Sequence, residues 1–376
     1  MTDQQNLPNG FLLGKYSIQQ ELGGNENSKL YLALDNQLKI YAIIEELFPQ
    51  SSVSRNPDGT LTKTNIDNFN IVSNTFNSDT QKMMTLVHPN VSQVVGHFSF
   101  NETVYRIFQH PGGETLESIL KKTLPGGILA DNQVASILPP ILDALRTGHS
   151  QNILHNNLNP ETIFIDRLGN PVLFKFGDTL ATQKPGYLAP ELKEWQGSVG
   201  PWSDIFALGA VLYRCTTGKD PVSAEQRKEE ISSGNYDPLK HNLDALASRV
   251  PTLAKAIKTS LFLSVKSRAQ DAQSFKAILD NTAAPGVADP GLAPVGLQTM
   301  APPPQDPASP QIFDPYAGAP GLNLQKGGSQ PQYVVEPPTS GPDAGSPSID
   351  LQKGGSPPQY ASEPPTPGPD AGSPSI

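Results

Sequence analysis

The chain is organised around residues 154–177, LHNNLNPETIFIDRLGNPVLFKFG. This stretch follows residues 130–149, ADNQVASILPPILDALRTGH, whose apolar residues recur every three or four positions. Such spacing predicts a buried helix, and a kink is expected at Pro139-Pro140. Further on, residues 200–221, GPWSDIFALGAVLYRCTTGKDP, are apolar on nearly all sides, which predicts a helix buried all round, with Ser203 as its N-cap. The stretch therefore lies within a helical unit, which residues 250–262 and 269–279 extend with two more helices.

The first part of the chain has a different periodicity. Between residues 15 and 42, the runs KYSIQQEL, KLYLALD and KIYAII alternate polar and apolar residues, with GGNENS and NQ between them. This alternation predicts three antiparallel strands joined by turns. A helix is expected at about residues 65–86.

Composition separates this folded part from a long tail. From Ala284 to Ile376, 22 of 93 residues are proline and 13 are glycine, and only ten are charged. Such a segment cannot bury enough apolar surface to offset a backbone entropy cost of roughly 1 to 2 kcal/mol per residue. We therefore expect residues 283–376 to be disordered and residues 10–282 to form the domain, after a flexible N-terminus at residues 1–9.

Several motifs carry a resemblance to a known family. Residues 41–49, YAIIEELFP, resemble the VAIKEYFP strand of bacterial serine/threonine protein kinases of the eukaryotic-like type, and the similarity continues along residues 10–282. GYLAPE at residues 186–191 resembles the end of the activation segment of that family. The opening stretch has the outline of the HRDxxxxN and DFG motifs. The resemblance implies an α+β, two-lobed kinase-like fold, with a small antiparallel β lobe plus one helix (about 10–110) and a larger helical lobe (about 111–282).

The positions that support the fold of this family are kept. The resemblance implies that Asp204 braces the backbone of the catalytic loop and that Arg268 pairs with Glu191. The retained positions are His155, Phe176, Gly177, Ala189, Pro190, Glu191, Asp204, Gly209 and Arg268.

The positions that carry phosphotransfer in the family are changed. In kinases they supply the glycine-rich loop, the phosphate lysine, its helix glutamate, the base and two metal ligands. Here the resemblance places Asn25 and Ser28 in the glycine-rich loop, Ile44 at the phosphate lysine, Asp79 at the helix glutamate, Asn157 at the base, and Thr162 and Lys175 at the two metal ligands.

These changes have large expected effects. Loss of a positioned base costs on the order of a hundred- to ten-thousandfold in rate. A divalent ion 4 Å from the ammonium of Lys175 meets roughly 8 kcal/mol of repulsion at an effective dielectric of 20. Asp178 is the only nearby acid that could replace the lost ligand. We therefore expect no magnesium and no ATP in the usual pose, while metal-independent nucleotide binding stays open. Phe108 falls at the gatekeeper position, where a bulky ring narrows an adenine pocket or simply forms core.

Lys175 invites a structural hypothesis. In the kinase outline it lies close to the helix that carries Asp79, so we predict that the two side chains pair and hold the lobes together. The alternative is a lysine that points into solvent.

Charge and targeting signals limit the partners. The net charge of −9 divides into −3 on the domain and −6 on the tail, and there is no cluster of lysine and arginine, so nucleic acid is not expected as a partner. The first ten residues lack a signal-peptide pattern, and no apolar run approaches the ~20 residues of a membrane span. The single cysteine, Cys215, lies in the stretch at residues 200–221 that predicts a helix buried all round, so we expect it to be an unreactive core residue. These features indicate a cytoplasmic protein with protein partners.

The tail contains two copies of a 27-residue repeat, at about residues 323–349 and 350–376. Each copy has a tyrosine beside a proline-rich EPPT motif, so the repeats are either a bivalent ligand for a partner or a low-complexity spacer. The candidate binding or phosphorylation residues are Tyr333, Thr339, Tyr360 and Thr366.

Taken together, these features predict a pseudokinase that is not an enzyme and that acts as a protein-binding scaffold or regulator. Two alternatives stay open. One is a weakly active or atypical nucleotide-handling enzyme with a kinase fold. The other is a structural assembly component whose proline-rich tail binds the partner.

Overall fold

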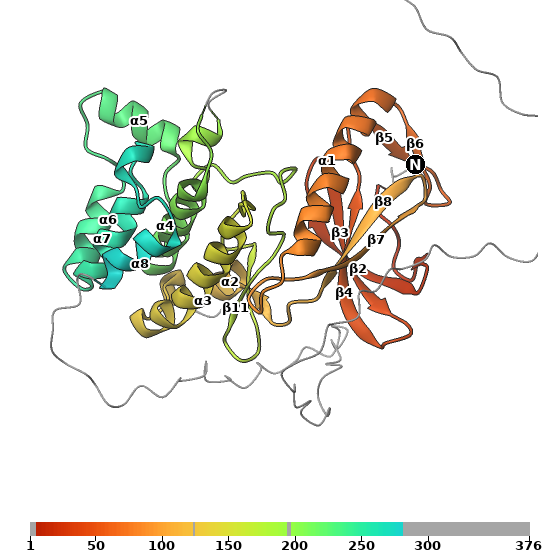
Figure 1. Ribbon diagram of the computed structural model, residues 1–376, viewed down its shortest axis with the longest axis horizontal. Coiled ribbons are helices and arrows are strands. Elements are labelled where there is room, and N and C mark those ends of the chain that lie inside the picture. The colour runs from red at the N-terminus through yellow and green to blue at the C-terminus, as the bar shows by residue number, and fades with distance from the viewer. Residues whose placement is uncertain (1–4, 123–124, 194–196, 281–376) are drawn as a thin grey trace, which may run out of the picture. The chain divides into compact units, whose positions relative to one another are not determined.

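The chain folds into two lobes, shown in Figure 1 as a computed structural model that describes residues 5–122, 125–193 and 197–280. An antiparallel sheet and one long helix form the small lobe, and most of the helices form the larger lobe. This arrangement confirms the predicted α+β, two-lobed kinase fold.

The small lobe is built on a six-stranded antiparallel sheet with the order β1-β2-β3-β4-β8-β7. Its strands are β1 (Leu12–Leu13), β2 (Tyr16–Gly24), β3 (Ser28–Asp35), β4 (Ile40–Leu47), β7 (Val94–Phe100) and β8 (Thr103–Gln109). The three strands predicted from the alternating runs are β2, β3 and β4. A short hairpin of β5 (Val53–Arg55) and β6 (Leu61–Lys63) follows β4 and leads into α1 (Ile66–Thr85).

Helix α1 begins after a side-chain cap and confirms the helix predicted at residues 65–86. The side-chain oxygen of Asn65 accepts a hydrogen bond from the N–H of Asn68 at 3.0 Å, which satisfies one of the free donors of the first turn. Phe69 and Phe76 on its buried face pack in one cluster with Leu47 at the end of β4.

The N-terminus is more ordered than predicted. Residues 1–9 were expected to be flexible, yet Leu7 is only 3% exposed and its N–H donates to the hydroxyl of Tyr31 at 3.2 Å. The side chain of Arg55 also donates to the carbonyl of Gln5 at 3.0 Å. The expectation is wrong for residues 5–9, because an apolar side chain in this polar segment finds a place in the core of the small lobe.

The larger lobe is mainly helical. Its helices are α2 (Leu116–Lys122), α3 (Asp131–Ser150), α4 (Pro201–Thr217), α5 (Ala224–Ser232), α6 (Lys240–Ala247), α7 (Pro251–Ser260) and α8 (Ala272–Asp280). A small sheet of β9 (Glu114–Thr115), β10 (Ile163–Ile165) and β11 (Pro171–Leu173) lies within residues 114–173. Helix α3 continues through Pro139 and Pro140.

Helix α4 is the central element of this lobe. Every residue from Ser203 to Thr216 is buried, as its apolar composition predicted. The prediction that Ser203 caps the helix is wrong. Gly200 is the cap and Pro201 occupies the first helical position, where its missing N–H costs nothing. Ser203 lies inside the first turn, and its hydroxyl donates to Glu191 at 2.8 Å.

The register of β3 and β4 decides which side chains face the larger lobe. Leu32 pairs with Ile43 and Leu30 with Glu45, while Tyr31 pairs with Ile44 on the opposite face. Tyr31 and Ile44 are fully buried in the core of the small lobe. Because side chains alternate along a strand, Tyr41, Ile43 and Glu45 lie on the face of β4 that is directed toward the larger lobe.

Two other predictions concern membrane-spanning segments and the C-terminal tail. In the described ranges, no helix combines the length and the apolar character needed to cross a bilayer. The tail, with its repeats and the residues Tyr333, Thr339, Tyr360 and Thr366, lies outside the described residues.

Candidate functional site

The loop that follows α3 is held by one carboxylate, as the retained positions predicted. Asp204 accepts hydrogen bonds from the backbone N–H groups of His155 at 2.7 Å and Asn156 at 3.0 Å. Its oxygen also lies 2.8 Å from Nε2 of His149. The acid is only 2% exposed, so these donors replace water in fixing the loop backbone.

A second retained pair anchors the segment before α4. Arg268 donates to both oxygens of Glu191, at 2.7 and 2.8 Å, in the two-pronged geometry of a strong ion pair. Its guanidinium also donates to the carbonyl of Phe262 at 2.6 Å and lies 4.9 Å from the ring centre of Phe206. The predicted pairing of Arg268 with Glu191 is therefore confirmed.

His155 is a buried neutral imidazole. Its ring lies 5.0 Å from the ring of Phe176, and no water-accessible surface remains. Burial outweighs the attraction of Asp204 and lowers the pKa of His155 to about 4. Gly177, next to Phe176, adopts φ 97°, a conformation that suits glycine.

This burial predicts a pH dependence of stability. The unfolded imidazole takes up a proton near pH 6.5, whereas the folded one does so only near pH 4. Unfolding is therefore coupled to the uptake of a proton by His155 between these two pH values. Above pH 6.5 His155 has no such effect on stability, and as the pH falls toward 4 it lowers the free energy of unfolding by roughly 3 kcal/mol in all. We expect His155→Phe to flatten the fall in denaturation midpoint between pH 6.5 and 4. A fall as steep as in the wild type would contradict the assignment.

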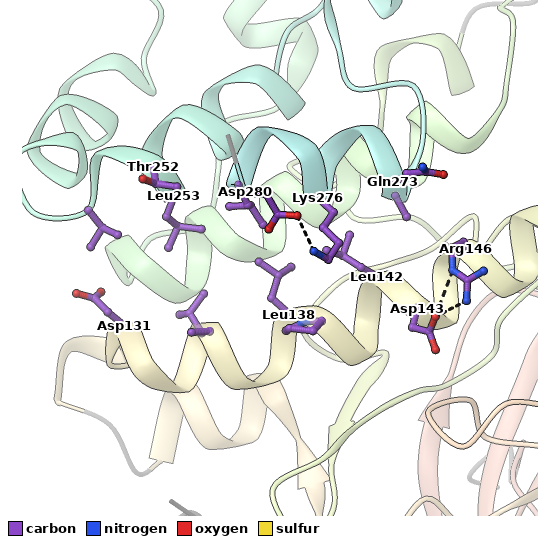
Figure 2. A pocket seen from close by; sticks show the side chains of 16 residues that line it. Asp131, Leu138, Leu142, Asp143, Arg146, Thr252, Leu253, Gln273, Lys276 and Asp280 are labelled. Atoms are coloured by element: carbon purple, nitrogen blue, oxygen red, sulfur yellow. Dashed lines mark hydrogen bonds and ion pairs between the residues drawn. The ribbon is translucent and has the colours of Figure 1, made fainter. Parts of the chain in front are cut away.

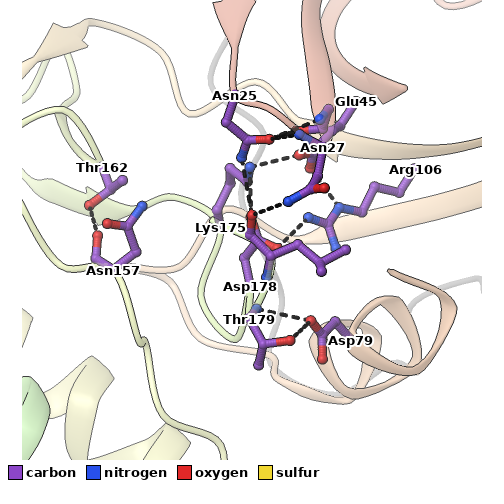
Figure 3. Close-up of polar contacts among 12 residues, drawn as sticks. Asn25, Asn27, Glu45, Asp79, Arg106, Asn157, Thr162, Lys175, Asp178 and Thr179 are labelled. Atoms are coloured by element: carbon purple, nitrogen blue, oxygen red, sulfur yellow. Dashed lines mark hydrogen bonds and ion pairs between the residues drawn. The ribbon is translucent and has the colours of Figure 1, made fainter. Parts of the chain in front are cut away.

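The two residues that the resemblance aligned with the family's base and first metal ligand contact each other. The hydroxyl of Thr162 donates to the backbone carbonyl of Asn157 at 2.9 Å, and the side-chain amide of Asn159 donates to the same carbonyl at 2.9 Å. Asn157 and Thr162 thus lie together, as Figure 3 shows, in a compact turn held by neutral groups.

Lys175 does not pair with Asp79, so that prediction is wrong. Its ammonium lies 2.6 Å from Glu45 on β4 and 2.6 Å from Asp178. Asp79 accepts hydrogen bonds from the N–H and hydroxyl of Thr179, at 2.9 and 2.6 Å. The two sites are drawn in Figure 3. The partners of Lys175 are therefore the buried acids Glu45 and Asp178 and not Asp79 on α1.

Arg106 on β8 completes a buried cluster of four charges, which we call the ion cluster: Glu45, Arg106, Lys175 and Asp178. Arg106 donates to Glu45 at 2.7 Å, and its other arm lies 3.1 Å from Asp178. Its guanidinium also lies 4.3 Å from the ring centre of Phe76 on α1. Sequence analysis missed Arg106 and Glu45, because neither occupies a motif position as the strands were aligned.

The cluster is electrically balanced. Its two cations and two anions are each at most 6% exposed. Burial alone would raise the pKa of Asp178, but Lys175 and Arg106 outweigh it and hold that pKa well below its usual range. Burial alone would lower the pKa of Lys175, but Asp178 and Glu45 raise it. Lys175 and Asp178 are therefore charged at neutral pH.

The structure also corrects the position assigned to Ile44. Ile44 packs in the core of the small lobe, on the far side of β4 from Lys175. Glu45 is the residue that faces the lobe interface, and its side chain contacts the residue in the family's metal-binding position. The structure thus brings Glu45, rather than Ile44, to the residue that the resemblance aligned with the metal-binding acid.

The turn between β2 and β3 is closed by its own side chains. The side-chain oxygen of Asn25 accepts from the N–H groups of Asn27 at 2.7 Å and Ser28 at 2.8 Å. Its amide donates to the carbonyl of Leu180 at 3.4 Å, across the lobe interface. These N–H groups are thus used within the turn, where kinases direct backbone toward phosphates.

The residues present do not fit a magnesium ion. Across residues 5–122, 125–193 and 197–280, no three or more His, Cys, Asp or Glu side chains are grouped so as to hold a metal. Asp178, the acid predicted as a substitute ligand, has its oxygens occupied by Lys175 and Arg106. Magnesium requires oxygen ligands, and the ammonium of Lys175 lies 2.6 Å from the oxygen of Asp178 that would have to supply one.

A large cleft opens beside the ion cluster. It has a volume of about 1220 Å³ and is lined by β2–β4, by the connection after β8 and by the loop around Asn157. A second cavity of about 530 Å³ lies between α3, α7 and α8, with the pairs Arg146–Asp143 and Lys276–Asp280 at its rim (Figure 2). The larger cleft is the candidate site, because four of the positions singled out in the sequence line it: Asn25, Asn157, Thr162 and Lys175.

The chain belongs to the protein kinase family: residues 60–277 match the protein kinase domain. Serine/threonine-protein kinase PrkC of Bacillus subtilis is 26% identical over 224 residues, which cover 56% of this chain and 32% of that protein. Probable serine/threonine-protein kinase PknB of Lactococcus lactis is 25% identical over 224 residues, which cover 56% of this chain and 34% of that protein. The chain thus spans about a third of these relatives.

Solved structures show the same fold. The apo form of PpkA-294 matches with a TM-score of 0.63 and 27% identity over 73% of this chain and 99% of that one. The kinase domain of Mycobacterium tuberculosis PknI matches with a TM-score of 0.55 and 20% identity over 73% of this chain and 99% of that one, which shows the fold alone.

Family membership corrects one prediction. The chain was expected not to be an enzyme, yet it carries a protein kinase domain, and its relatives include serine/threonine-protein kinase PrkC and probable serine/threonine-protein kinase PknB. The absence of enzymatic activity therefore does not follow from the changed positions.

Proposed function

We propose that this chain is a degenerate kinase, a pseudokinase in its cleft chemistry, that regulates a protein partner by binding it. The observation that carries the proposal is the exchange of charge between Glu45 and Lys175. In the family, a lysine contacts the nucleotide phosphates and an acid holds magnesium. Here the same two places hold an acid and a lysine that bind each other at 2.6 Å.

The exchange gives the lobes a contact of their own. Lys175 and Asp178 belong to the segment that follows β11, whereas Glu45 and Arg106 belong to the sheet of the small lobe. The ion cluster therefore joins the two lobes in a place where kinases use the nucleotide and its metal. We infer that the chain presents a closed, kinase-shaped surface to its partner without Mg·ATP.

A second candidate is an atypical nucleotide-handling enzyme. It is favoured by the volume of the cleft and by the intact bracing of the loop by Asp204. In that case any transfer would proceed without magnesium in its usual position. The third reading, assembly through the tail, concerns residues outside the described ranges.

A thermal-shift titration with ATP tests the proposal, with and without magnesium or manganese. A ligand that binds the native state stabilises it by RT ln(1 + [L]/Kd), about 2.7 kcal/mol at a hundred times Kd. We expect no metal-dependent increment, because Lys175 and Arg106 already contact the oxygens of Asp178. An active serine/threonine kinase domain measured in parallel serves as the control, and a magnesium-dependent shift of similar size in both proteins would overturn the proposal.

A further inference from the structure

We propose that the second cavity, between α3, α7 and α8, is a docking site for a segment of this same chain: residues 311–316, QIFDPY, which lie outside the described residues. Phe313 is the side chain that enters the cavity. The site belongs to the larger lobe, and the inference is independent of what the cleft binds. A partner that used this surface would first have to displace the segment.

The walls of the cavity are aliphatic. Leu138 on α3 and Leu253 on α7 point into it (Figure 2), and Leu142 lines it as well. The three side chains are each at most 7% exposed, whereas Ala135 and Pro139 at the open side of α3 are exposed. Since apolar surface gains about 25 cal/mol per Å² when it is covered, such a cavity favours an apolar side chain over a polar one.

The lining distinguishes between the apolar parts of the tail. Among the described residues that line the cavity, none is aromatic. Proline-rich motifs dock on grooves lined by aromatic rings, so the EPPT motifs fit this cavity poorly. Phe313 is the only phenylalanine after Asp280, and it directly follows Ile312. Tyr333 would bring a hydroxyl group, whose burial costs free energy unless it finds a hydrogen-bond partner.

The described part of the chain ends at the rim of this cavity. Helix α8 ends at Asp280, which is one of the lining residues. Phe313 follows Asp280 by 33 residues, and a flexible chain of that length spans about 30 Å. A segment tethered in this way is present at an effective concentration in the millimolar range, so even weak binding fills the cavity.

The charges at the rim complement those of the segment. Arg146 and Lys276 are 62% and 59% exposed, and each pairs with an aspartate at 2.6 Å. Exposed pairs contribute only about 0 to 1 kcal/mol, so either cation exchanges its partner at little cost. Residues 281–325 contain three aspartates and no lysine or arginine. Because Asp314 directly follows Phe313, a docked ring brings its carboxylate to this rim.

The test follows a fluorescently labelled peptide of residues 305–318, QDPASPQIFDPYAG, as it binds the full chain and its variants, measured by fluorescence polarisation. In Phe313→Ser the chain's own segment no longer competes, so we expect saturable one-to-one binding. In the wild type the tethered segment occupies the cavity, so the same peptide should bind about tenfold or more weakly.

A second variant locates the binding site. Ala135 is exposed and lines the cavity, so Ala135→Trp should fill it. Combined with Phe313→Ser, this change should weaken peptide binding by about tenfold or more. Ser136→Trp is the matched control, because Ser136 is exposed at the next position of α3 and is not a lining residue. If Ala135→Trp does not fold, Ala135→Glu brings a charge to the same position.

Each contrary result has its own meaning. Equal affinity of the peptide for the wild type and Phe313→Ser would assign the cavity to a separate molecule, such as a second copy. Unchanged binding in the Ala135 variants would place the peptide elsewhere on the chain. Tighter binding of a peptide of residues 328–341, centred on Tyr333, would give the cavity to the first repeat. Any of these results, or no peptide binding at all, would overturn the inference.

Discussion

Replacing Lys175 with methionine is expected to lower the free energy of unfolding by about 3 to 5 kcal/mol, because removal of one partner leaves buried charge uncompensated. In the variant, Glu45 and Asp178 would share the single guanidinium of Arg106. Methionine is unbranched, as lysine is, so it meets the same backbone requirement at φ 60°. Urea denaturation of the full chain measures the loss.

A double variant separates the ion pair from simple packing. Glu45→Gln together with Lys175→Met removes one charge of each sign. The double variant should therefore lose clearly less free energy of unfolding than the two single variants lose in sum, with a coupling energy of about 1 to 3 kcal/mol. Lys82→Met is the surface control: Lys82 is 56% exposed and lies 3.9 Å from Asp79, so about 0.5 kcal/mol or less is expected. Strict additivity at Glu45 and Lys175 would show that the cluster does not join the lobes as proposed.

Arg268→Leu is expected to have an effect of similar size. It removes both hydrogen bonds to Glu191, which is 4% exposed, and leaves that carboxylate buried. The expected loss is about 3 to 5 kcal/mol, measured by the denaturation midpoint at pH 7. Arg249→Leu, which breaks an exposed pair with Asp131 at 3.2 Å, is the matched control and should change stability by about 0.5 kcal/mol or less.

The pH dependence of this loss identifies its cause. In the wild type, burial raises the pKa of Glu191, but Arg268 outweighs it and the folded pKa lies below its ordinary value. The wild type therefore loses stability as pH falls through that pKa. In Arg268→Leu the folded pKa is expected above the unfolded value, so protonation relieves the buried charge. The difference between the two proteins should shrink in acid, and a constant difference would point to packing alone.

Much of the fold followed from local sequence. Period-two alternation predicted β2, β3 and β4, and apolar spacing predicted α3 and α4, because these signals depend only on residues near one another in the chain. The family resemblance also predicted that Asp204 braces the loop and that Arg268 pairs with Glu191. These partners lie far apart in sequence, and the family resemblance connected them.

The interior of the candidate site was predicted less well. Lys175 was assigned to Asp79 because both belong to elements that meet, and Ile44 was aligned with the phosphate lysine where Glu45 is the residue that faces the interface. A shift of one residue along a strand moves a side chain to the other face, so a small error in alignment reverses its role. Ser203 has a common capping residue type, yet the chain begins α4 at Gly200.

The sequence by itself thus determined the two lobes and their main elements. Only the tertiary structure decided that Lys175 binds Glu45 and Asp178, and that Arg106 completes a neutral cluster. The physical reason is that a buried charge selects its partner by distance in three dimensions, and no local pattern marks an arginine on β8 as the neighbour of a lysine 69 positions later in the chain.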